Sequence, residues 1–246
     1  MTDDEDDLGR AGGALAAGDR DRHALRRTAG LVRSSMTAAG ARSVSSGKWL
    51  AETMLDAAPH VPARDLPTLR AHHGQSGPEL AHVLIRNAAR TTAAMGAVAG
   101  GVAGVSEMAP PTWLALPAEL VVETLAVVAV EMKLVAELHA VYERPVTGTP
   151  TERGAAVARA WAERRGVTAR DLVRAGGLSK ALGQSTRREL TRVLQRRLAG
   201  RALRNLPTLA PFLAGAVAGA EINRRATRSL GEAVARDLVA VRRPGG

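Results

Sequence analysis

The chain contains no cysteine and very few aromatic residues, with one Tyr, one Phe and three Trp among 246 residues. The absence of cysteine excludes disulfide frameworks, thiolate catalysis and cysteine-ligated zinc sites. The scarcity of aromatic residues argues against a β-sandwich or barrel, whose strands favour aromatic and β-branched side chains. No segment alternates polar and apolar residues over the length of a strand. We therefore predict an all-α fold, a multi-helix bundle with tightly packed Gly/Ala-rich helices.

Charge and proline divide the chain into segments. It opens with five consecutive acidic residues, Asp3–Asp7, the reverse of the basic and apolar start of a secretory signal. Such a run is typical of a disordered, solvated tail, and a shield over a basic surface is the alternative. We predict a disordered acidic tail at 1–7, a helical annex with a Pro/Gly linker at 8–75, a main helical domain at 76–241 and a frayed tail at 242–246.

Several residues predict where helices begin, break and lie. Gly30 is expected to interrupt the Ala-rich helical segment near the N-terminus. Pro78 suits the first turn of a helix, where the missing N–H costs little, and Thr151 is a candidate cap for a later one. The longest periodic segment is 113–143, and residues 124–130 within it are apolar on all sides. The middle of that helix is therefore predicted to be buried.

Glycines recur every four residues in two Ala-rich segments, at 96, 100 and 104 and again at 215 and 219. This spacing places them on one face of a helix, where another backbone can approach closely. Each glycine costs a helix about 1 kcal/mol relative to Ala, so we expect a compensating contact, of one segment with the other or of both with the long helix. Asn223 is interpreted as a core amide joining two helices. The predicted helix-packing residues are Gly96, Gly100, Gly104, Gly215, Gly219 and Asn223.

Residues 108–130 form a stretch of 23 without Lys or Arg, which is long enough to span a bilayer. Glu119 and Glu123 lie near its middle, however, and their insertion cost of roughly 5 kcal/mol offsets the gain from the apolar residues. The sequence leaves three states open: a membrane span, a hairpin or peripheral association, and a buried soluble core.

The C-terminal part is strongly basic. Residues 151–246 contain 20 basic and 7 acidic residues, a net charge of +13, whereas residues 1–150 have a net charge of −3. This imbalance favours contact with phosphate groups of anionic lipid or nucleic acid, and lipid fits better because few aromatic residues are available to stack on bases. A merely solvated Arg face stays open. The candidate contact residues are Arg188, Arg192, Arg196, Arg197, Arg201 and Arg204.

Only one Glu-x-x-His pair, Glu79 and His82, occurs in the chain. A carboxylate-bridged dimetal bundle needs two such pairs and two further Glu residues. Glu119 and Glu123 share a helix face and could contribute carboxylates, but the second pair is missing. We therefore predict no metal, no cofactor and no catalytic residues, and we keep a metal- or ligand-dependent enzyme that uses these Glu and His residues as the alternative.

Two blocks of small residues are distinctive. One block is Gly96–Gly104, Pro110, Leu116-Pro117 and the apolar helix that ends at Tyr142; the other is Leu206-Pro207, Gly215-Ala216, Gly219-Ala220, Asn223, Thr227, Leu230-Gly231 and Ala233. Together they resemble the bacterial EcsC family over roughly residues 78–240. The family pattern leads us to expect Gly directly after Tyr142, and this chain has Glu143 there. The resemblance implies a helical protein without an established activity. Because the family's namesake is encoded beside an ABC transporter, it also implies a membrane-linked accessory role.

Together, these observations predict a cytoplasmic, non-enzymatic accessory or interaction protein. We expect it to associate peripherally with the inner face of the cell membrane or with a membrane-protein partner such as an ABC transporter. The alternatives are the metal- or ligand-dependent enzyme and nonspecific nucleic-acid binding through the basic C-terminal half.

Overall fold

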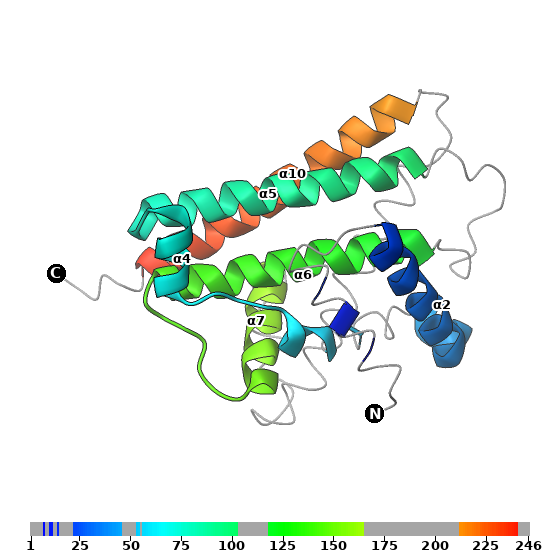
Figure 1. The fold of residues 1–246 in the computed structure, drawn as a ribbon, viewed down its shortest axis with the longest axis horizontal. Helices are drawn as coiled ribbons and strands as arrows, with labels where there is room; N and C mark the ends of the chain where they lie inside the picture. The colour runs from blue at the N-terminus through cyan, green and yellow to red at the C-terminus, as the bar shows by residue number, and fades with distance from the viewer. Residues whose placement is uncertain are drawn as a thin grey trace.

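The computed structural model describes residues 22–45, 53–54, 56–102, 118–164 and 212–240, together with Asp7, Arg10, Ala11 and Ala14 near the N-terminus. Every regular element in these residues is helical, as the sequence predicted (Figure 1). The elements are α2 (Arg22–Ser45), the short 3-10 helix η1 (Ala58–His60), α4 (Leu66–His73), α5 (Gly77–Val102), α6 (Ala118–Val141), α7 (Pro150–Arg164) and α10 (Phe212–Ala240).

The helix α6 lies at the centre of the bundle. Helices α5 and α10 run side by side in opposite directions and cover one side of α6, whereas α7 packs on another side and crosses it (Figure 1). All residues from Val121 to Met132 are buried, which confirms the predicted burial of the middle of this helix. The side chains around the whole circumference of α6 therefore meet other parts of the protein, and α5, α7 and α10 supply much of that covering.

The N-terminal third contributes to the same hydrophobic core. Val32 of α2, Met54, and Leu69 of α4 are each at most 1% exposed and belong to one apolar cluster with α5, α6, α7 and α10. The predicted break at Gly30 is wrong, because α2 runs through it without interruption. One glycine weakens a helix by about 1 kcal/mol, which is too little to end it when the flanking turns are packed.

The Pro/Gly-rich segment before α5 contains a helix that the sequence interpretation lacked. The side chain of Asp65 accepts a hydrogen bond from the Thr68 N–H and caps the start of α4, where Pro67 also fits. Gly74 ends α4 with a φ of 65°, in the left-handed region that glycine favours. Prolines and glycines therefore bound a short helix here. At the start of α5, Pro78 occupies the first turn as predicted.

The cap of α7 differs from the predicted one. Thr149 Oγ1 accepts from the Glu152 N–H at 3.3 Å, and Glu152 Oε2 accepts from the Thr149 N–H at 2.8 Å. These reciprocal bonds form a capping box. Thr151 is already inside the helix, since Pro150 fits the first helical position and the cap, Thr149, lies two residues before the predicted one.

The C-terminal end of α6 turns at Glu143, whose φ is 58°. The Glu143 N–H donates to the Ala140 carbonyl and the Arg144 N–H to the His139 carbonyl, so the last carbonyls of the helix are bonded. Glycine would adopt this left-handed conformation with less strain. The position where the EcsC resemblance predicts glycine thus has a backbone conformation that suits glycine.

Within the described helices, none combines the length and apolarity needed to cross a bilayer. Residues 108–117, which supply the first part of the candidate span, lie outside the described residues. The predicted tail at 242–246 and all of the predicted tail at 1–7 except Asp7 also lie outside them.

Candidate functional site

A network of buried polar side chains lies where α5, α6, α7 and α10 meet. We call it the polar junction, and its members are Thr92, Glu123, Glu131, Trp161, Asn223 and Thr227. Each of the four helices contributes at least one member. Burial of polar groups is costly unless they are hydrogen-bonded, so the bonds within this network decide whether it stabilises the bundle.

The backbones of α5 and α10 approach closely beside the junction. A Cβ atom added to Gly96 would lie 2.5 Å from the Gly219 carbonyl oxygen and 2.6 Å from Asn223 Nδ2. A Cβ atom on Gly219 would lie 2.6 Å from the Gly96 carbonyl oxygen. Real Cβ atoms do not approach other atoms so closely. The two glycines therefore permit a separation between the helices that no larger residue allows.

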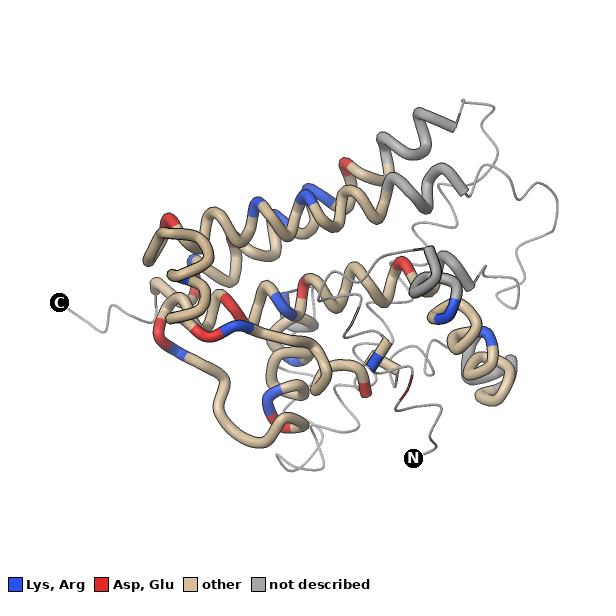
Figure 2. The backbone as a smooth tube through the Cα atoms, in the orientation of Figure 1, with Lys and Arg blue, Asp and Glu red and all other residues tan. Residues whose placement is uncertain are grey.

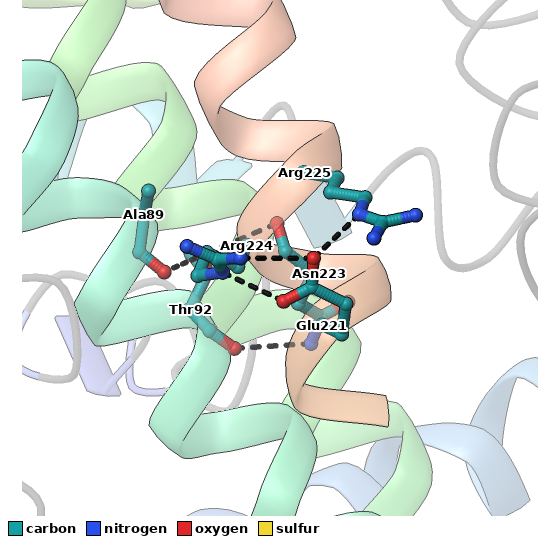
Figure 3. Close-up of polar contacts among 6 residues, drawn as sticks. All are labelled: Ala89, Thr92, Glu221, Asn223, Arg224 and Arg225. Carbon is teal, nitrogen blue, oxygen red and sulfur yellow. Dashed lines mark hydrogen bonds and ion pairs between the residues drawn. The ribbon is translucent and has the colours of Figure 1, made fainter. Parts of the chain in front are cut away.

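Asn223 joins α10 to two other helices. Its Nδ2 donates to the Thr92 carbonyl oxygen at 3.1 Å and to Glu123 Oε1 at 3.2 Å (Figure 3 shows the bond to Thr92). The residue is only 3% exposed. Both amide hydrogens are therefore used inside the protein, one on α5 and one on α6, which is the arrangement of a core amide that ties helices together.

A second branch of the junction ends on Glu131, which is fully buried. Thr92 Oγ1 donates to Thr227 Oγ1 at 2.9 Å, and Thr227 Oγ1 donates in turn to Glu131 Oε1 at 2.8 Å. Trp161 Nε1 donates to Glu131 Oε2 at 2.8 Å. Each carboxylate oxygen thus accepts a bond from a different helix. This branch connects α5 and α10 to α6 and α7 through a single side chain.

A separate ion pair fastens the segment before α4 to α6. Arg64 Nε and a terminal guanidinium nitrogen donate to the two oxygens of Glu137, at 2.8 and 3.1 Å. The Glu137 side chain is 4% exposed. Hydrogen bonding to this carboxylate raises the pKa of Arg64 above its ordinary value. Two-point contacts of this kind fix orientation as well as distance.

His73 of α4 lies close to that ion pair. Its Nε2 atom is buried and has no hydrogen-bond partner among the described residues. Burial lowers the pKa of His73, and the positive charge of Arg64 and the neighbouring His72 ring lower it further, while Glu137 acts in the opposite direction. The neutral imidazole is therefore favoured in the folded protein.

The structure separates the residues of the alternative metal site. Glu79 and His82 are exposed near the start of α5, whereas Glu123 bonds to Asn223 beside Thr92. Thirteen residues of helix between Glu79 and Thr92 correspond to about 20 Å. Among the described side chains, no three His, Asp or Glu residues gather in a way that could hold a metal ion. Glu119 lies in α6, but the surroundings of its side chain lie outside the described residues.

Other predicted site residues are only partly described. Gly100 and Gly215 lie within α5 and α10, but their surroundings are not described, and Gly104 lies outside the described residues. The candidate residues for contact with anionic partners also lie outside them: Arg188, Arg192, Arg196, Arg197, Arg201 and Arg204.

Sequence reasoning missed most of the polar junction. Periodicity shows that the side chains of Thr92, Glu131 and Trp161 can face the interior of the bundle. It does not identify their hydrogen-bond partners, which lie 30 to 135 residues away in the sequence. It also missed Gly154, where a Cβ atom would lie 2.7 Å from the backbone nitrogen of Pro59. Gly154 is an isolated glycine in α7, so no repeat in the sequence indicated that it packs closely against another segment.

Comparison with protein-family models, curated proteins and solved structures finds no match to this chain.

Proposed function

We propose that this protein is a non-enzymatic accessory protein that binds peripherally to an anionic membrane surface, on the cytoplasmic side. A membrane protein such as an ABC transporter is the partner that the EcsC resemblance suggests. The observation that carries the proposal is the charge of residues 151–246, a net +13 on a chain whose first 150 residues have a net charge of −3. Such one-sided positive charge attracts anionic headgroups at about 1 kcal/mol for each Lys or Arg near the surface.

The geometry of the buried carboxylates supports a structural role for them. Glu131 is 0% and Glu123 is 9% exposed, and both accept hydrogen bonds from side chains of neighbouring helices. A catalytic carboxylate has to reach a substrate, and both of these side chains lie between packed helices. Because these carboxylates hold helices together, we look for the function on the surface of the bundle.

Vesicle co-sedimentation tests the proposal. The full chain is mixed with vesicles of phosphatidylcholine alone or of phosphatidylcholine with phosphatidylglycerol, over a range of salt concentrations. We expect binding to the anionic vesicles only. It should weaken steeply with salt, because the screening length falls from about 30 Å at 0.01 M to about 3 Å at 1 M.

A variant with fewer positive charges and a parallel measurement of DNA binding extend this test. The Arg188→Gln, Arg192→Gln, Arg196→Gln triple variant should bind anionic vesicles more weakly than the unaltered chain. Retention on duplex DNA at the same salt concentration is measured in parallel, since DNA also attracts basic proteins. Failure of the unaltered chain to bind anionic vesicles at low salt would refute the proposal, and tighter retention on DNA than on vesicles would favour the nucleic-acid alternative.

A further inference from the structure

The side of α10 that points away from the bundle combines apolar and cationic residues. Ile222 and Val239 are the two large hydrophobic residues that are exposed among the described ones, at 39% and 41%. Arg225 and Arg236 are also exposed. The stripe is formed by positions spaced three and four residues apart, which lie along one side of a helix: Ile222, Arg225, Ser229, Glu232, Arg236 and Val239. Its one acidic residue, Glu232, pairs with Arg228. This stripe lies opposite Thr227 and Gly231, which face the core.

Helix α5, which lies beside α10, adds further positive charge at the same height along the helix axis. Arg86 and Arg90 of α5 are exposed and lie one turn apart. The contacts of Gly96 with Gly219 and of Ile85 with Gly231 fix the register of the antiparallel pair. This register places Arg90 level with Arg225. We define the outer face of the α5–α10 pair by its exposed residues Arg86, Arg90, Ile222, Arg225, Arg236 and Val239. Figure 2 shows Lys and Arg positions along these two helices.

Not all arginines of the two helices are balanced by acidic partners. Helices α5 and α10 together contain six Arg and four acidic residues. Glu221 pairs with Arg224 and Arg225 at 2.7 and 2.5 Å, and these pairs lower its pKa to about 2, so it stays ionised. Among the described residues, α10 also forms ion pairs through Arg228 with Glu232 at 3.0 Å and through Asp237 with Arg164 of α7.

The remaining arginines are Arg86, Arg90 and Arg236. Among the described residues, none of these three forms an ion pair, although Arg64, Arg70 and Arg164 elsewhere in the bundle do. The outer face therefore holds positive charges without acidic partners in the described part of the chain. Exposed apolar side chains lie on the same face.

We propose that the outer face of the α5–α10 pair is a docking surface for an anionic lipid bilayer. This inference rests on the proposed function and names the surface that would meet the membrane. Arginine side chains can extend to phosphate groups while their methylene carbons lie on apolar surface. Ile222 and Val239 contact the boundary between headgroups and acyl chains, as apolar residues of interfacial helices do. The two helices lie flat on the membrane, and the polar junction stays inside the bundle.

Two triple variants of equal charge test this surface. The test variant is Arg86→Gln, Arg90→Gln, Arg236→Gln. The control variant, Arg27→Gln, Arg70→Gln, Arg153→Gln, changes exposed arginines on α2, α4 and α7. All six positions are exposed, so both variants should fold, which circular dichroism checks. Binding to phosphatidylcholine vesicles with and without phosphatidylglycerol is then compared at low salt.

We expect the test variant to bind anionic vesicles about tenfold or more weakly, because each arginine near the surface contributes to attraction. The control variant should lose much less. Equal losses in the two variants would overturn the proposal in favour of net charge alone. Unchanged binding of the test variant, combined with loss in the Arg188, Arg192, Arg196 variant, would overturn it and leave the proposed function standing. No binding by the unaltered chain would overturn both.

A fluorescent label gives a second readout that does not depend on net charge. Because the chain has no cysteine, Ile222→Cys introduces a single labelling site on the outer face, and Thr68→Cys on the exposed side of α4 provides the control. With an environment-sensitive dye, the label at 222 should shift to shorter wavelength on anionic vesicles and be quenched by brominated acyl chains, whereas the label at 68 should do neither. Equal responses at both sites would contradict the proposed orientation.

Discussion

Helix α2 and the α5–α10 pair have similar compositions and very different surroundings. All three helices are rich in alanine and contain glycine in their interiors. A Cβ atom added to Gly30 of α2 would meet nothing within 4 Å, whereas one added to Gly96 or Gly219 would collide with backbone of the other helix. A glycine in a helix therefore does not indicate close packing by itself. The four-residue repeat is what distinguished the two segments in the sequence.

Polar residues show the same contrast. Thr37 of α2 donates to the Arg33 carbonyl of its own helix, at an exposed position. Thr227 of α10 lies in the core and connects Thr92 of α5 to Glu131 of α6. The hydrogen bond of Thr37 replaces a hydrogen bond with water, so it contributes little to the free energy of unfolding. The bonds of Thr227 hold elements that are far apart in the sequence, and their loss removes hydrogen bonds from the buried interior of the bundle.

The largest effect is expected when a methyl group is added at the two kinds of glycine. Gly96→Ala should lower the free energy of unfolding by about 3 kcal/mol, because the new Cβ atom overlaps backbone that cannot move aside cheaply. Gly30→Ala should raise it by up to about 1 kcal/mol, since the position is open and alanine favours helix. Urea denaturation monitored by circular dichroism measures both. Effects of the same sign would break the comparison.

A smaller effect is expected from removal of a single hydroxyl group. Thr227→Val should lower the free energy of unfolding by about 2 kcal/mol, because Glu131 loses a donor inside the core. The Thr92 hydroxyl can still donate to the Ala89 carbonyl. Thr37→Val should change it by less than about 0.5 kcal/mol, as is usual for exposed positions. The same urea titrations compare the two variants. A cost at Thr37 as large as that at Thr227 would show that the polar junction is no more important than an exposed hydrogen bond.

The smallest effect concerns pH and the short helix α4, where His73 lies close to the Arg64–Glu137 ion pair. The pKa of His73 is lowered from its ordinary value of 6.5 in the folded protein, so the unfolded chain binds more protons in that range. Stability should therefore decline as pH falls below about 6.5. The groups that act on His73 are Arg64, His72 and Glu137. In His73→Gln this part of the pH dependence should be absent, as measured by the melting temperature from pH 7.5 to 5; an unchanged profile would contradict the assignment.

Composition and local pattern were sufficient to predict the helical class, the buried middle of α6 and the start of α5 at Pro78. These features depend on residues close together in the sequence, whose spacing is visible without coordinates. The same reasoning failed at Gly30, where packing outweighs a small local penalty, and at α4, where prolines were interpreted as a linker. It also placed the α7 cap at Thr151 and not at Thr149.

The polar junction illustrates why the rest could not be predicted. Glu123, Glu131 and Glu137 all lie on α6, and their positions in the sequence do not identify their partners. Their actual partners include Asn223 of α10, Trp161 of α7 and Arg64 of the segment before α4. Which partner reaches which carboxylate depends on the three-dimensional arrangement of helices. One sequence without that arrangement does not determine it.

Native-state hydrogen exchange tests most directly the central claim that contacts between helices, rather than helix propensity, stabilise this bundle. Amides of α5 and α10 near Gly96 and Gly219 should exchange only through global unfolding, with protection that falls in step with stability in Thr227→Val. Amides of α2 around Gly30 should exchange faster, through local opening. Equal protection of α2 and the α5–α10 pair, unaffected by Thr227→Val, would contradict the account.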